Sequence, residues 1–175
     1  MKQHQRLAIS QGIYSQSNQP TERRAQIVSI DLWQYKMNKG NQAFYENNPV
    51  FALRYFKQAV EVADNLLLLS FQQGSDPTAA LQAMGQSQRN LTELFVRYEI
   101  MEEAINIRET FFNQLIEFLT WKNGNIPFRA TFLSAMESEL EMLLTLYYTM
   151  DVDQDKITSA ISTAQHIRTA HPATH

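Results

Sequence analysis

The feature that most constrains this chain is an apolar pattern with intervals of three and four residues, repeated in six segments. In the first segment the pattern runs through Ile30, Trp33, Met37, Gly40 and Phe44. Such intervals place side chains on one face of an α-helix. No segment alternates apolar and polar residues over the length of a strand. The sequence therefore predicts an all-α fold of about six helices, with no sheet.

Residues that start or end helices separate the six segments. They stand at 47–49, 74–77, near 99, at 124–127 and at 151–155, and they include Pro49, Gly74 and Pro127. Proline fits the first turn of a helix because its missing N–H would be unpaired there. Helices of roughly 18–24 residues with short connections become antiparallel neighbours. We therefore expect three antiparallel helical hairpins in succession.

Composition and charge narrow the class of protein. The 175 residues are 44% hydrophobic, contain no cysteine and carry a net charge of −3. The lack of cysteine excludes disulfide frameworks, thiolate zinc sites and cysteine nucleophiles. The acidic balance argues against nucleic-acid binding, and the longest apolar run, Leu66–Leu69, is too short to span a membrane.

No signal peptide is recognisable at the N-terminus, so we expect a cytoplasmic, bacterial protein. Residues 1–22 are rich in Gln, Ser and Asn and predict a flexible arm. One domain is expected at residues 23–169, followed by a loose C-terminus at 170–175.

The second predicted helix combines small and large residues in a recognisable order. Gly40 precedes an Ala-x-x-x-Phe-x-x-Ala pattern formed by Ala52, Phe56 and Ala59. Small residues allow two helix axes to approach, and a phenylalanine fills the space beside them. This arrangement over residues 33–64 resembles a tetratricopeptide (TPR) repeat. The resemblance implies hairpins stacked in a right-handed superhelix.

The later hairpins depart from the TPR pattern. A weaker second copy has Thr92 in place of the small glycine, Arg108 in place of the aromatic residue and Phe111 in place of the last alanine. The helices are also longer than TPR helices: the step from Ala52 to Ala104 is 52 residues, and the step to Ala160 is 56, against about 34 in the family. The alternative is a compact six-helix bundle with one repeat-like hairpin.

The TPR resemblance implies a concave groove lined by the first helix of each hairpin. The corresponding residues are Gln34, Met37, Asn41, Phe44 and Tyr45 in the first unit and Gln86, Arg89, Asn90, Glu93 and Arg97 in the second. Asparagine can bond peptide groups and arginine can pair with carboxylates. Met37 occupies the position of a lysine that TPR clamps for chaperone tails use, which argues against that ligand. For Met37 and Phe44 the alternative is a place in the core. The third unit's groove register stays open.

Residues for catalysis or metal binding are scarce. Histidine occurs only at 4, 166, 171 and 175, so most of the chain lacks a histidine base. Asp151, Asp153 and Asp155 resemble the start of a calcium-binding loop, but Lys156 and Ser162 stand where glycine and glutamate are needed. We expect these aspartates to cap a helix. Glu137 and Glu141 predict a solvated acidic surface, and no cofactor or metal is predicted.

The sequence thus favours a non-enzymatic module that binds a protein or peptide in a groove. Two alternatives remain. One is a self-associating structural protein, a homodimer for instance, with Leu144, Tyr147 and Tyr148 at the contact. The other is a small-ligand sensor with a pocket lined by Met84, Phe132 and Met136.

Overall fold

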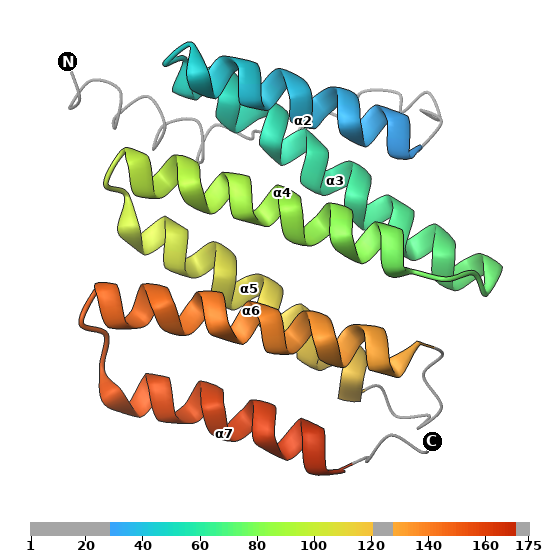
Figure 1. Ribbon diagram of the computed structural model, residues 1–175, viewed down its shortest axis with the longest axis vertical. Coiled ribbons are helices and arrows are strands. Elements are labelled where there is room, and N and C mark those ends of the chain that lie inside the picture. The colour runs from blue at the N-terminus through green and yellow to red at the C-terminus, as the bar shows by residue number, and fades with distance from the viewer. Residues whose placement is uncertain (1–28, 121–127, 171–175) are drawn as a thin grey trace, which may run out of the picture.

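A computed structural model describes residues 29–120 and 128–170, which form six helices and no strand. The helices are α2 (Ile30–Tyr45), α3 (Pro49–Gln73), α4 (Thr78–Arg97), α5 (Met101–Thr120), α6 (Arg129–Thr149) and α7 (Gln154–Ala170) (Figure 1). The predicted all-α class and the three antiparallel hairpins are confirmed. The predicted arm at 1–22, the loop at 124–127 and residues 171–175 lie outside the described residues.

The helices form an open array. In Figure 1, α2, α4 and α6 lie in one row, with α3 and α5 behind it. Each helix packs on the next one along the chain, and α2 also contacts α4, α4 contacts α6, and α5 contacts α7. Within the described ranges α2 contacts neither α6 nor α7. The six helices therefore do not close into a bundle, and the right-handed superhelix stays a prediction.

The three turns inside the hairpins have the same geometry. Asn47, Glu99 and Asp151 each adopt a positive φ, of 56°, 59° and 51°. In each turn the next backbone N–H donates to the carbonyl five residues back, with N···O distances of 2.8, 2.9 and 3.0 Å for Asn48, Ile100 and Val152. In such a bond the N–H donates to a carbonyl oxygen that the helix end would otherwise leave unpaired. The same turn therefore ends the first helix of each of the three hairpins.

These turns reveal a regular repeat of 52 residues. The first helices end at Tyr45, Arg97 and Thr149, so the three units share one register (45 to 97 and 97 to 149). The predicted equivalence of Ala160 with Ala52 and Ala104, which required a 56-residue step, is therefore wrong. In the 52-residue register the third-unit equivalent of these alanines is Lys156. Both alanines are fully buried, whereas Lys156 is exposed on α7, the last helix of the described array. A small residue is not required there.

Gly40 brings α2 close to α3. A Cβ atom at Gly40 would lie closer than 3.0 Å to two ring carbons of Phe56. Phe56 itself is buried, with Ala52 and Ala59 beside it in one hydrophobic cluster. The predicted packing role of these small residues is confirmed.

Candidate functional site

The contact between α2 and α4 is closed by direct side-chain contacts. The Trp33 indole N–H donates to Ser87 Oγ at 2.8 Å, and Ser87 Oγ lies 3.6 Å from Met37 Sδ. Met37 is only 5% exposed and belongs to the hydrophobic core. The structure thus places Met37 where it offers almost no surface to a partner.

Amide side chains join the same two helices. The Asn90 amide donates to Asn41 Oδ1 at 2.7 Å, and the Gln86 amide donates to Asn90 Oδ1 at 2.9 Å. All three are partly buried. Asn41 and Asn90, predicted to bond a bound chain, instead bond each other across the α2–α4 contact.

The end of this contact is closed by Arg97. Its guanidinium donates to Asn47 Oδ1 at 2.6 Å and to the Phe44 carbonyl at 3.4 Å. It also stacks on the Phe44 ring, 4.4 Å from the centroid. Tyr45 is 77% exposed, beside Phe44, and Gln34 and Glu93 are exposed on α2 and α4. Arg97 and Phe44 thus hold the first two hairpins together.

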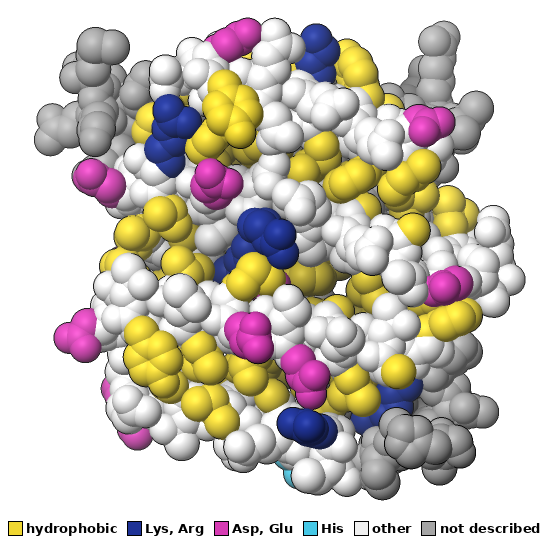
Figure 2. All heavy atoms as spheres, viewed as in Figure 1, with side chains coloured by type: hydrophobic (Ala, Val, Ile, Leu, Met, Phe, Trp, Pro, Cys, Tyr) yellow, Lys and Arg dark blue, Asp and Glu magenta, His cyan; other side chains and the backbone are white. Residues whose placement is uncertain are grey.

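The next contact along the row, between α4 and α6, is open. It forms a groove of about 620 Å³, and Figure 2 shows this face of the molecule hollowed between the two helices. We call it the α4–α6 groove. It is lined by Thr78, Leu81, Gln82, Gly85, Gln86, Arg89, Phe111, Ala130, Thr131, Ser134, Ala135, Ser138, Glu139 and Met142. Of the predicted site residues, Gln86 and Arg89 line this groove.

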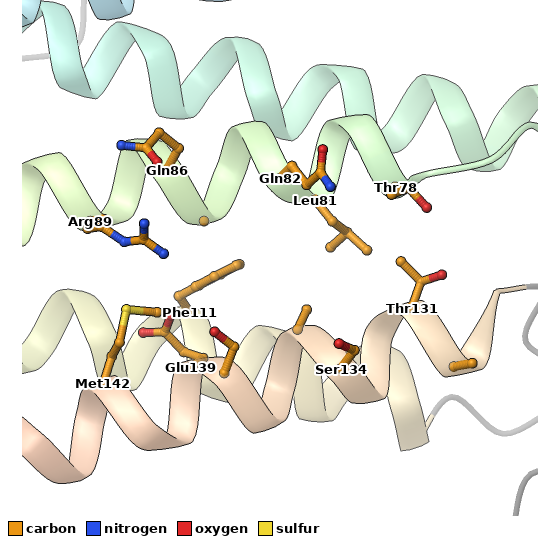
Figure 3. A pocket seen from close by; sticks show the side chains of 14 residues that line it. Thr78, Leu81, Gln82, Gln86, Arg89, Phe111, Thr131, Ser134, Glu139 and Met142 are labelled. Carbon is orange, nitrogen blue, oxygen red and sulfur yellow. The ribbon is translucent and has the colours of Figure 1, made fainter.

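The lining combines an apolar floor with polar walls. Phe111 of α5 closes the back, hydroxyl groups stand on both sides, and the glutamine amides lie on the α4 side (Figure 3). Gly85 leaves the α4 wall without a side chain: a Cβ there would meet only a Phe111 ring carbon, at 3.9 Å. Such walls can both donate hydrogen bonds to backbone peptide groups and accept them.

A buried ion pair lies at the base of the groove. Nη1 of Arg108 donates to both carboxylate oxygens of Glu139, at 3.0 and 2.8 Å. Arg108 is 2% exposed and Glu139 is 1% exposed, and the buried Arg108 Nε has no partner. Burial raises the pKa of Glu139 to about 7, although the charges of Arg108 and, more weakly, Arg89 oppose that rise.

Arg89 is the exposed charge of the groove. Its guanidinium projects from α4 toward Glu139 and Met142 (Figure 3). Across residues 29–120 and 128–170, no carboxylate oxygen lies within 4.0 Å of it. Arg89 therefore remains available to a ligand.

The sequence prediction missed the α6 wall, including Ser134, Ser138 and Glu139. Apolar spacing alone predicts a face of Leu133, Met136, Leu140, Leu143 and Tyr147 for this helix, whereas the buried face has Phe132 and Glu139 in place of Leu133 and Leu140. A signal was present: Arg108 at the aromatic position of the TPR pattern. A charge in the core needs a buried partner, and Glu139 stands at core spacing between Met136 and Leu143.

The residues named for the two alternative functions lie mainly in the core. Met84, Phe132 and Met136 are buried and line no part of the groove. Tyr147, expected at a self-association surface, is buried, and its hydroxyl donates to Glu109 at 2.6 Å. Tyr148 is 62% exposed. Met84, Phe132 and Met136 thus pack together in one core cluster and do not line the groove, and Tyr147 and Tyr148 differ in exposure.

Of the three aspartates expected to cap a helix, Asp153 makes a capping bond, whereas Asp151 is the positive-φ residue of the preceding turn. Asp153 Oδ1 accepts a bond from the Asp155 N–H at 3.0 Å, so Asp153 caps α7. Glu137 and Glu141 are exposed. Over the described chain, no three His, Asp or Glu side chains are grouped to hold a metal ion. Nor is any of the six helices long and apolar enough to cross a membrane.

The chain belongs to a family described as "Protein of unknown function (DUF2753)", whose model matches residues 31–175. No curated protein and no solved structure matches the chain. The matched segment contains the six helices except Ile30, the first residue of α2, and the whole α4–α6 groove.

Proposed function

We propose that this protein is a non-enzymatic interaction module that holds a segment of a partner polypeptide in the α4–α6 groove. The observation that carries the proposal is the difference between two equivalent helix–helix contacts, the closed one between α2 and α4 and the open one between α4 and α6. The α2–α4 contact is filled by Trp33 and Met37 and tied by Asn41 and Asn90. The α4–α6 contact leaves about 620 Å³ open.

The dimensions of the groove suit a short peptide segment. From Thr78 to Arg89 the α4 wall runs about 17 Å at 1.5 Å per residue. An extended chain covers that length with about five residues. Gln82, Gln86 and Ser134 can satisfy the peptide groups that such a segment buries.

The net charge of the chain bears on the kind of partner. The net charge of −3 disfavours nucleic acid as the partner. We further propose a cytoplasmic location. We also propose that no cofactor is needed, since binding to a preformed groove requires no chemistry beyond contact.

Site-specific photo-crosslinking in cells tests the proposal. A photoreactive residue replaces Ser134 in the groove or, as the matched control, the exposed Asn113 of α5, which lies outside the groove. We expect a defined protein adduct from position 134 that is absent from position 113. Ser138→Arg should remove the adduct, because the longer side chain occupies the groove, and Asn113→Arg should leave it unchanged. Identical adducts from both positions, or an adduct that survives Ser138→Arg, would overturn the proposal.

A further inference from the structure

The open groove and the closed contact are equivalent positions of the 52-residue repeat. In this register Gly85 of α4 corresponds to Trp33 of α2, and Glu139 of α6 corresponds to Ser87 of α4. Trp33 and Ser87 face each other and are hydrogen bonded, and Gly85 and Glu139 both line the groove. The α4–α6 groove therefore lies where the Trp33 indole lies one unit earlier.

Packing does not explain the glycine at position 85. Unlike Gly40, Gly85 has room for a Cβ atom, with its nearest neighbour at an ordinary 3.9 Å, and its φ is not positive. Glycine in a helix interior is less favourable than alanine. What Gly85 provides is an empty space beside Phe111.

The groups around this space suit an aromatic side chain with an N–H donor. Glu139 stands where Ser87 stands beside Trp33. Its side chain is 1% exposed at the base of the groove and both oxygens already accept from Arg108 Nη1, so an indole N–H would share one of these acceptors. Arg89 corresponds to Met37 and extends into the groove (Figure 3), where a guanidinium can stack on an indole ring. Phe111 and Met142 supply apolar and sulfur contacts.

Charge disfavours a cationic anchor. Glu139 is already paired with Arg108, and Arg89 adds a second positive charge nearby. A lysine or arginine from a partner would meet both arginines, whereas a neutral N–H donor would meet only the acceptor.

We propose that the α4–α6 groove anchors its partner through a tryptophan side chain, which lies beside Gly85 and donates its indole N–H to Glu139. This inference rests on the proposed function and names the group that the groove recognises. The internal repeat supplies the template, because Trp33 already makes the equivalent contact within the chain.

Binding of amino-acid amides to the full chain tests the anchor directly. The probes are N-acetyl-tryptophanamide, its 1-methylindole analogue, which lacks the N–H donor, and N-acetyl-phenylalaninamide. Backbone amide shifts in ¹H–¹⁵N spectra report both the site and the dissociation constant. For a ligand of this size we expect a dissociation constant of about 1 mM, with shifts centred on Gly85 and Glu139. Loss of the N–H should weaken binding about fivefold.

Two variants that fill the space provide the protein-side test. Gly85→Trp and Gly85→Leu should both abolish the shifts, and Gly85→Ala should retain them, since a methyl group leaves most of the groove open. The wild-type comparison of the three probes does not depend on whether either variant folds. Equal binding of the methylated probe, tighter binding of the phenylalanine probe, or no shifts at about 10 mM would overturn the inference.

Failure of the anchor is distinguishable from failure of the proposed function. If position 134 captures a partner segment without tryptophan, the peptide-binding function stands and the tryptophan anchor is refuted. If the captured segment contains tryptophan and its Trp→Ala form is no longer captured, the anchor is supported. A captured tryptophan segment that tolerates Trp→Ala refutes the anchor.

Discussion

Replacing Gly40 by alanine should destabilise the protein, although the same substitution at most exposed helix positions is stabilising. The added Cβ would lie closer than 3.0 Å to two ring carbons of the buried Phe56. Overpacking of this kind costs about 1–3 kcal/mol. The gain in helix propensity from Gly to Ala is about 0.5–1 kcal/mol. We expect a net loss of about 1–2 kcal/mol in the free energy of unfolding.

Gly85→Ala is the matched control, because it makes the same chemical change in another first helix without a close neighbour. Its nearest contact would be an ordinary 3.9 Å to Phe111, so only the propensity gain of about 0.5–1 kcal/mol remains. Urea denaturation followed by circular dichroism measures both values, and unchanged m-values confirm a common unfolding transition. A Gly40→Ala variant as stable as Gly85→Ala would refute the close approach of α2 and α3.

Three further predictions concern the groove, the closed contact and the last helix. The pKa of Glu139 is about 7 in the folded protein and about 4.5 in the unfolded chain, so the unfolded chain loses this proton first as pH rises. The free energy of unfolding should therefore fall between these two pH values. Relative to Glu139→Gln, that fall should be roughly 3 kcal/mol, and a pH-independent difference in urea titrations at pH 5–8 would contradict it. A double-mutant cycle of Trp33→Phe and Ser87→Ala should give a coupling energy of about 1 kcal/mol, because each variant removes the same 2.8 Å bond; additive losses would speak against the bond. Asp153→Ala should cost about 1 kcal/mol through loss of the α7 cap, and millimolar calcium should leave the melting temperature of the wild type unchanged.

The helical pattern made the fold largely predictable. Side chains at intervals of three and four were enough to locate all six helices, since amphipathic helices bury one face. Gly40 and Phe56 gave the correct close contact because they match the order of small and aromatic residues in the TPR pattern. The register of the third unit was missed because it is set by the backbone turns at Asn47, Glu99 and Asp151, and none of these residues is the glycine that usually marks a positive φ.

The site was less predictable, for two physical reasons. A residue on the first helix of a hairpin can face the groove or the neighbouring hairpin, and a shift of one residue, about 100° around the helix, separates the two outcomes. Asn41 and Asn90 bond each other, whereas Arg89 reaches the groove. Glu139 was missed because a hydrophobic stripe was chosen from apolar residues alone. Its partner, Arg108, was noticed only as a departure from the TPR pattern.

Among the described helices, close backbone contacts join helices one or two steps apart along the chain, and Phe71 of α3 also stacks on Phe132 of α6. This arrangement has a consequence for local opening. In such arrays stability is a sum of neighbouring terms, so the terminal hairpins fray at a lower free energy than the centre. The α6 side of the groove belongs to the last hairpin. Occupancy of the groove would therefore slow amide hydrogen exchange in α6 and α7 more than in α3, linking ligand capture to the cooperativity of one end of the array.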